Sequence, residues 1–254
     1  AASTVVSTVV DNTAPTGGSV SYTNGYVTAA SVAVTVGNGT DGGSGISTST
    51  TQLRRTAASL TNGTCGTFGS PVNIGAAGAA SPITDTSVVS GNCYQYQYVV
   101  TDNVGNSATF TSNNVVKVDT SAPVFTVTAS GTNVSATGAT AYFKNPGSGS
   151  FTVTASDPES GVASSTFPAA PTGWTVSGSG NARTYTLNGA TVSSSIVVSA
   201  TNGAGTSSGN QTITITVDAT APTATAGAIA PIDNTTTPGF IRQGGQYYIY
   251  ATVA

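Results

Sequence analysis

The sequence predicts an all-β chain made of consecutive β-sandwich domains. Two observations favour strands over helices: valine, threonine and tyrosine are frequent, and long runs of Leu, Glu, Lys and Ala are missing. A third observation, a phrase that recurs about once per 100 residues, indicates the domain size, because one β-sandwich takes about that length. Charged residues make up only 6% of the 254 residues, so we expect Thr, Ser and Asn to supply the polar faces of the strands.

The recurring phrase has the form Asp-x-Thr/Ser-Ala-Pro. It reads DNTAP at 11–15, DTSAP at 119–123 and DATAP at 218–222, with its aspartates 108 and 99 residues apart. The proline fixes φ where one domain ends and the next begins, so each phrase predicts a short, stiff linker. Alternate residues before each aspartate match one another, which places them on one face of a closing strand. They are Val6, Thr8 and Val10; Asn114, Val116 and Val118; and Ile213, Ile215 and Val217.

Two further landmarks recur inside this period. TVGNGTDGGSGI (35–46) matches VTASDPESGV (153–162), since both run from an apolar strand through an acidic residue to Ser-Gly and a β-branched residue. YQYVVTDNVGN (96–106) matches IVVSATNGAGT (196–206), since both run from a strand into a Gly-containing hairpin turn. In sandwich lettering these are strand B with its B–C loop, and strand F with its F–G turn.

With these motifs the chain resembles the bacterial immunoglobulin-like domains that occur in tandem on large secreted and cell-surface proteins. The resemblance covers nearly the whole chain and depends on the linker phrase, the Asp-x-x-Ser-Gly-Ile/Val loop and the strand and turn YVVTDNVGN (98–106). It implies tandem immunoglobulin-like antiparallel β-sandwiches with a structural or adhesive role, and it names no ligand.

The same phrase sets the expected domain boundaries. Residues 11–119 and 120–218 should each form a complete sandwich, residues 1–10 the final strand of an incomplete preceding repeat, and residues 219–254 the first two strands of an incomplete following one. Two interpretations of these ends stay open: a window of a longer array, or subunits that complement one another by strand addition. The window is favoured, because joining both ends yields about three strands, too few to close a two-sheet core.

Cys65 and Cys93 are the only cysteines, and an even count in an extracellular-looking chain predicts one disulfide, with free buried thiols as the alternative. The inward face of strand F should carry Tyr96 and Tyr98. Cys93 lies an odd number of positions away, so it should face outward or precede the regular strand. We therefore expect a clamp on the excursion NGTCGTFGSPVNIG (62–75), not the core bridge of antibody domains.

The acidic residues of the loops, turns and linkers form a calcium hypothesis. They are Asp41, Asp102, Asp119, Asp157, Glu159 and Asp218. Asp41, Asp102 and Asp119 belong to the B–C loop, F–G turn and linker of one domain, which can meet at one end of a sandwich. Calcium takes about six to eight oxygen ligands, and the resemblance allows it at such junctions without requiring it. The alternative is that these side chains cap their own turns, so no cofactor is certain.

The second repeat differs in this respect from the first. It has Asn202 in place of Asp102, although it adds Glu159 beside Asp157. The amide offers one oxygen where a carboxylate offers two, which weakens the calcium hypothesis for this repeat.

Groups for catalysis are scarce. The chain has no histidine and only one glutamate, so general acid–base chemistry lacks its usual participants. GNGTDG (37–42) matches a phosphate-binding pattern, but we expect no helix after it. GTSSG (205–209) matches a serine-nucleophile pattern, but no histidine is there to act as its base. We therefore expect that the protein is not an enzyme.

A net charge of −3, with no basic cluster beyond Arg54–Arg55, argues against nucleic acid as a partner. No apolar stretch approaches the roughly 20 residues of a transmembrane helix. The expected function is structural and extracellular: a tandem stalk, filament or lattice component on a bacterial cell surface, with neighbouring repeats or copies of the same protein as partners. One alternative is an adhesin that binds a host or matrix glycan or protein. The other is an accessory module of a secreted polysaccharide-active enzyme.

Overall fold

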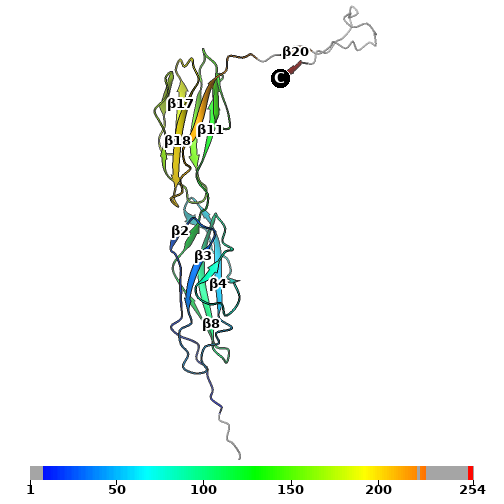
Figure 1. Ribbon diagram of the computed structural model, residues 1–254, viewed down its shortest axis with the longest axis vertical. Coiled ribbons are helices and arrows are strands. Elements are labelled where there is room, and N and C mark those ends of the chain that lie inside the picture. Colours follow the sequence, from blue (N-terminus) through cyan, green and yellow to red (C-terminus); the bar gives the residue numbers. More distant parts are fainter. Residues whose placement is uncertain (1–7, 222–223, 227–250, 254) are drawn as a thin grey trace, which may run out of the picture.

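The computed structural model describes residues 8–221, 224–226 and 251–253, and within these ranges it contains strands, turns and bends but no helix. Two elongated β-sandwiches follow one another end to end, and the chain enters the first at one end of the rod and leaves the second at the other (Figure 1). The predicted fold class, tandem immunoglobulin-like antiparallel β-sandwiches, is confirmed. Val6, which was expected on a closing strand, lies outside the described residues.

The first sandwich packs a three-stranded sheet against a larger one. The smaller sheet has the order β1 (Ser19–Ser21), β3 (Val32–Gly37), β7 (Ile83–Asp85). The larger sheet has the order β2 (Gly25–Val27), β10 (Val116–Val118), β8 (Asn92–Thr101), β4 (Gln52–Thr61), β5 (Thr64–Cys65), with β6 (Val72–Ile74) also paired to β4 and β9 (Ser107–Thr111) to β8. All these pairs are antiparallel except β2 with β10.

The second sandwich repeats this plan. Its four-stranded sheet has the order β11 (Val124–Ser130), β14 (Ser150–Ser156), β17 (Ala182–Leu187), β16 (Trp174–Ser177). Its five-stranded sheet has the order β12 (Val134–Thr137), β13 (Thr140–Phe143), β19 (Gln211–Val217), β18 (Ser194–Asn202), β15 (Val162–Thr166). Beyond the second sandwich, β20 (Ala224–Ala226) pairs antiparallel with β21 (Ala251–Val253).

The closing strands show that the two sandwiches share one geometry. In each, the closing strand runs parallel to a short early strand: Val118 pairs with Val27, and Val217 with Phe143. The linker aspartate then donates its backbone N–H to the same early residue, from Asp119 to Val27 O at 3.1 Å and from Asp218 to Phe143 O at 2.8 Å. The repeat inferred from the sequence therefore corresponds to a repeat of hydrogen-bonding geometry.

The cores follow the predicted alternation. In strand F of the first sandwich (β8), Tyr94, Tyr96, Tyr98 and Val100 are buried between the sheets, and β18 buries Ile196, Val198 and Ala200 in the same way. The valine and isoleucine side chains among them each contribute about 1.5–3 kcal/mol when fully removed from water. The residues that close the strands, Val116, Val118, Ile213 and Ile215, are buried as well, whereas Val10 at the corresponding place before the first linker is 81% exposed.

The predicted disulfide between Cys65 and Cys93 is present, with Cα atoms 5.8 Å apart. Cys93 lies on the opposite face of β8 from the core tyrosines, as its position in the strand indicated. It is nevertheless fully buried, because Cys65 and Phe68 of the excursion, together with Tyr26 and Val115, cover that outer face. A small apolar cluster forms there, separate from the main core; it consists of Ala58, Leu60 and Cys93, with Tyr26, Cys65, Phe68 and Val115 packed against them.

The described residues contain no helix with the length and apolar character that a membrane-spanning segment requires.

Candidate functional site: acidic groups and the junction between the sandwiches

The structure gathers acidic side chains of the recurring loops into two groups. Asp11, Asp41 and Asp102 form the first, and Asp119, Asp157 and Glu159 form the second; in each, one carboxylate oxygen per residue lies within 4.8 Å of the others.

This grouping corrects one expectation. Asp119 does not join Asp41 and Asp102, because a linker aspartate belongs to the sandwich that follows it rather than to the one it closes. The B–C loop and F–G turn meet at the end where the chain enters a sandwich. Asp218 joins neither group; it is exposed and accepts a hydrogen bond of 3.0 Å from Thr220 N.

The first group holds its loops through backbone donors. Asp11 Oδ2 accepts a 2.6 Å hydrogen bond from Ser44 N, and Asp41 Oδ1 accepts one of 2.8 Å from Gly45 N. The backbone hydrogen bonds from Thr13 and Ser44 lower the pKa of Asp11 to about 2.

Asp102 organises the F–G turn of the first sandwich. Its Oδ1 accepts backbone hydrogen bonds from Val104, Gly105 and Asn106 at 2.9, 2.6 and 2.8 Å. Desolvation opposes ionisation of this buried carboxyl, but the hydrogen bonds from the Asn106 side chain and from this turn outweigh it and lower the pKa of Asp102. Turn capping, the alternative to calcium, therefore occurs in this group.

The second group is buried at the entrance to the second sandwich. Asp119, Asp157 and Asn202 are 0%, 4% and 1% exposed. The two aspartates each use one oxygen for a local turn: Asp119 Oδ1 accepts from Ser121 N at 3.1 Å, and Asp157 Oδ1 from Ser160 N at 2.9 Å. Their other oxygens both face Asn202.

The Asn202 amide lies between these two carboxylates. Its Nδ2 donates to Asp119 Oδ2 at 2.9 Å, to Asp157 Oδ2 at 3.1 Å and to Ser121 O at 2.9 Å. Its Oδ1 accepts from Thr206 N at 2.7 Å, which corresponds to the bond from Asn106 N to Asp102 in the first sandwich. The substitution therefore keeps the turn cap but places a hydrogen-bond donor where the first sandwich has a carboxylate oxygen.

The two groups thus differ in what they offer a cation. The first presents three carboxylates, the ligand type that calcium prefers. In the second, the Asn202 amide already supplies the donor between Asp119 and Asp157. Calcium binding stays a prediction for these residues.

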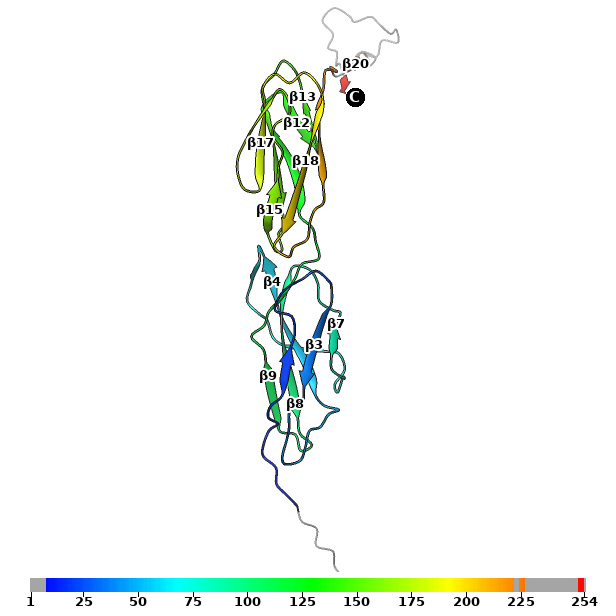
Figure 2. The ribbon, with the colours of Figure 1, turned by 60° about the vertical axis from the view of Figure 1, so that its left-hand side comes forward.

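Direct hydrogen bonds join the two sandwiches next to the second group. The tip of the β4–β5 hairpin donates two backbone hydrogen bonds of 2.9 Å, from Asn62 N to Pro158 O and from Gly63 N to Glu159 O. Figure 2 shows the end of β4 directed at the second sandwich. In addition, Thr120 N donates to Ser90 Oγ at 3.0 Å. The linker region is therefore supported from the side as well as along the chain.

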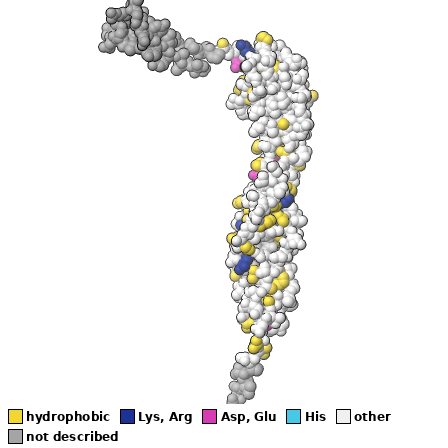
Figure 3. Space-filling view, turned by 180° about the vertical axis from the view of Figure 1, so that it is seen from behind, with side chains coloured by type: hydrophobic (Ala, Val, Ile, Leu, Met, Phe, Trp, Pro, Cys, Tyr) yellow, Lys and Arg dark blue, Asp and Glu magenta, His cyan; other side chains and the backbone are white. Residues whose placement is uncertain are grey.

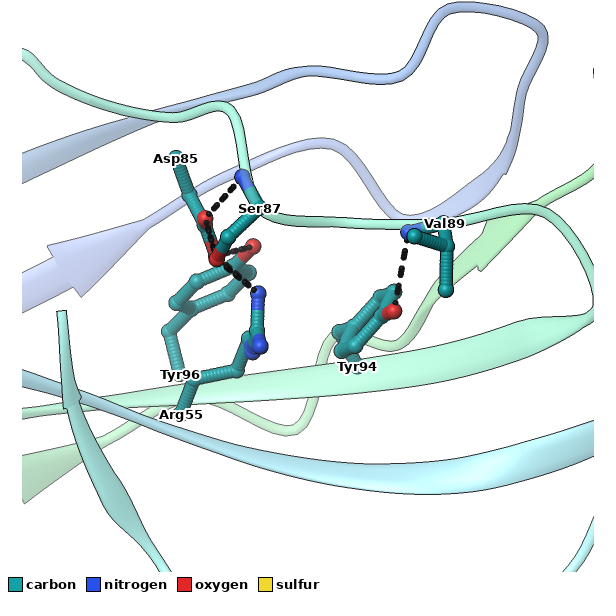
Figure 4. Close-up of polar contacts among 6 residues, drawn as sticks. All are labelled: Arg55, Asp85, Ser87, Val89, Tyr94 and Tyr96. Atoms are coloured by element: carbon teal, nitrogen blue, oxygen red, sulfur yellow. Dashed lines mark hydrogen bonds and ion pairs between the residues drawn. The ribbon is translucent and has the colours of Figure 1, made fainter.

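A polar network in the first sandwich was not anticipated from the sequence (Figure 4). Asp85 Oδ2 pairs with Arg55 Nη1 at 2.7 Å and accepts a 2.9 Å hydrogen bond from the Tyr96 hydroxyl, while Ser87 donates to Oδ1 from its backbone and hydroxyl. The Arg55 guanidinium also lies 4.6 Å from the centre of the Tyr94 ring. Asp85-Thr86-Ser87 has the Asp-x-Ser/Thr pattern of the linkers. This pattern was the one feature of the sequence that could have indicated a hydrogen-bonded aspartate at this position.

The network is closed rather than open to a substrate. Asp85 is 2% exposed. Burial opposes ionisation of its carboxyl, but the hydrogen bonds from Ser87, Tyr96 and Arg55 lower its pKa, and burial together with the neighbouring Asp85 charge raises the pKa of Tyr96. The Asp85 carboxylate has a partner on each oxygen inside the sandwich, which indicates a structural role, although the buried Nε of Arg55 has no hydrogen-bond partner among the described residues.

Comparisons with models of known protein families and with curated proteins give no match. Several solved structures are similar at low identity. A three-domain titin fragment, I67–I69 in an E-to-A variant, is 13% identical, with 83% of this chain and 70% of that chain covered and a TM-score of 0.34. Fibronectin(III)-like modules of Clostridium thermocellum CbhA are 15% identical, covering 80% and 94%, with a TM-score of 0.29. Titin domains z1z2 in complex with telethonin are 14% identical, covering 81% and 97%, with a TM-score of 0.27.

Proposed function

We propose that this chain is a structural spacer: a stalk or filament component of a bacterial cell surface, built from immunoglobulin-like sandwiches in a semi-rigid row. The observation that carries the proposal is the junction, where a short linker and lateral hydrogen bonds hold two sandwiches end to end. A stalk needs length and resistance to bending, and this arrangement supplies both.

The linker between the two sandwiches restricts bending at the junction. Only residues 119–123 separate the closing strand β10 from β11, and Pro123 restricts φ within that stretch. Domains in one chain generally move relative to one another unless their interface is substantial. Here the buried Asp119 at the start of the linker and the backbone bonds of Asn62 and Gly63 add contacts beyond the covalent connection.

The surface supports packing beside other copies. On the face that Figure 3 draws, charged side chains are few and scattered along the rod. With 6% charged residues in the sequence, side-by-side packing of rods meets little like-charge repulsion. The disulfide fits an oxidising, extracellular location, where such bonds form and persist.

Small-angle X-ray scattering and negative-stain microscopy of the purified chain test the proposal. We expect an elongated particle whose scattering fits one dominant arrangement of the two sandwiches. Continuous fibres would indicate that the chain is a filament component. Separate short rods would indicate that it is part of a stalk. A broad range of bend angles at the junction would contradict the spacer role. Specific binding of the chain to glycans or host proteins would instead support the adhesin alternative.

A further inference from the structure

The turn at Asn62–Gly63 is built to present backbone donors to the second sandwich. It connects β4 and β5 through two residues with positive φ, 46° at Asn62 and 76° at Gly63, which is the conformation of a type I′ hairpin turn. Both residues donate their N–H groups across the junction, to Pro158 O and Glu159 O. These acceptors belong to the B–C loop of the second sandwich, where Pro158 follows Asp157 and Glu159 is itself a member of the second group.

Two side chains of the first sandwich, those of Lys117 and Tyr26, lie next to this turn and support it. Lys117 Nζ donates a 2.7 Å hydrogen bond to Gly63 O and lies 5.4 Å from the centre of the Tyr26 ring. A Cβ at Gly63 would lie 2.7 Å from the Tyr26 hydroxyl oxygen and 3.4 Å from Ser160 O. The positive φ at Gly63 favours glycine, and a larger residue there would have to displace the Tyr26 hydroxyl.

The disulfide is attached to the strand that follows the turn. Cys65 is two residues after Gly63, in the edge strand β5, which pairs with β4 at Leu60–Cys65 and Thr61–Thr64. The segment after β5 adds backbone hydrogen bonds to β4, from Gly66 N to Ser59 O and from Gly69 N to Ala57 O. A two-stranded hairpin is nevertheless only marginally stable by its own hydrogen bonds. The bond to Cys93 ties it to β8, an interior strand of the larger sheet.

We infer that the Cys65–Cys93 disulfide braces the junction: it fixes the Asn62–Gly63 turn where the turn holds the second sandwich. Two observations favour this role over stabilisation of the fold. The disulfide belongs to the outer apolar cluster and not to the main core of the first sandwich. In the second sandwich, β15, the strand that corresponds to β4, pairs only with β18 and has no hairpin extension. The inference concerns only the relative orientation of the two sandwiches, and it does not depend on the proposed function.

Nuclear magnetic resonance of the full chain tests the brace. Residual dipolar couplings report whether two domains share one orientation, and amide exchange reports whether individual hydrogen bonds persist. In the Cys65→Ser/Cys93→Ser variant we expect both sandwiches to keep their chemical shifts outside the hairpin. The two sandwiches should then no longer share one alignment tensor, and exchange at the Asn62 and Gly63 amides should rise by about tenfold or more. A shared tensor and unchanged exchange in this variant would overturn the inference.

A second variant leaves the disulfide intact. Gly63→Ala should loosen the junction in the same way, because the methyl group contacts the Tyr26 hydroxyl and disturbs the contacts of Tyr26 and Lys117 that support the turn. Its matched control is Gly189→Ala, which has a similar φ of +83° but nothing within 4 Å of the added Cβ. If Gly63→Ala loosens the junction no more than Gly189→Ala does, the turn does not hold the second sandwich, and the inference that it is braced there is refuted. If the double serine variant fails to fold, the single variant Cys65→Ser, which removes the bond but leaves the buried Cys93 side chain in place, is measured in the same way.

Discussion

The side-chain amide of Asn202 donates a 2.9 Å hydrogen bond to the carboxylate of Asp119, which lies 83 residues earlier in the chain. This contact ties the F–G turn of the second sandwich to the linker that enters it. The first sandwich has Asp102 at the corresponding position, in a group with the carboxylates of Asp11 and Asp41. The change from carboxylate to amide and the additional Glu159 thus distinguish the second entrance from the first.

Asn202→Asp should destabilise the second sandwich strongly. The variant removes the donor between two buried carboxylates and adds a further negative charge to a group that already holds Asp119, Asp157 and Glu159, so we expect the free energy of unfolding to fall by about 3 kcal/mol or more. Trp174, which is 6% exposed in the second sandwich, provides the fluorescence signal for urea unfolding. We further expect added Ca²⁺ to restore part of the loss, because carboxylate oxygens are its preferred ligands.

Asp102→Asn is the reciprocal control for this prediction. It introduces at the first entrance the residue that the second already has, and it keeps the Oδ1 that caps the turn. We expect a smaller loss of stability than in Asn202→Asp. An Asn202→Asp variant as stable as the parent protein in the presence of chelator would contradict the role assigned to the amide.

Asp85→Asn should destabilise the first sandwich. The change leaves Arg55 without its partner, and breaking a buried ion pair on one side costs about 3–5 kcal/mol. Urea unfolding followed by tyrosine fluorescence measures the loss. Arg54→Ala is the matched control, because Arg54 is bonded at an exposed site to Asn73 and should change stability by only about 0.5 kcal/mol. Equal effects of the two variants would contradict a structural role for the network.

Stability should fall in acid. The pKa values of Asp85 and Asp102 are lowered in the folded protein, and that of Asp11 is about 2. A carboxyl whose folded-state pKa is depressed stabilises the fold fully above its unfolded value, about 3.9, and loses this contribution as the pH falls toward the folded value. Urea midpoints should therefore be similar at neutral pH and about pH 5, and lower at about pH 3. Equal midpoints across this range would contradict the prediction.

Ile215→Ala should show how much the closing strand contributes. Ile215 is fully buried in the core of the second sandwich, so its truncation should cost about 2–5 kcal/mol of unfolding free energy. Val197→Ala on the neighbouring strand β18 is the control, since Val197 is 47% exposed and should change stability by only about 0.5 kcal/mol. Trp174 fluorescence during urea unfolding measures both variants, and similar losses would contradict the assigned register.

Local pattern was enough to predict much of this protein. The alternation of Tyr96, Tyr98 and Val100 predicted the inward face of strand F, because successive side chains of a strand point to opposite sides. The same rule predicted that Cys93 faces away from the core. The linker phrases predicted the repeat of the closing strands, and two cysteines allowed only one intramolecular bond.

Contacts between distant segments were decided only by the tertiary structure. Each linker aspartate follows the last strand of one sandwich and precedes the first strand of the next, so the sequence does not show to which sandwich its side chain belongs. Only the packing shows that Asp119 joins Asp157 rather than Asp41 and Asp102. The pairing of Arg55 with Asp85, and of the Asn62–Gly63 turn with the second sandwich, likewise depends on how sheets and domains are placed in space. The physical reason is that strand alternation is a property of neighbouring residues, whereas polar partners are chosen by proximity after the sheets have packed.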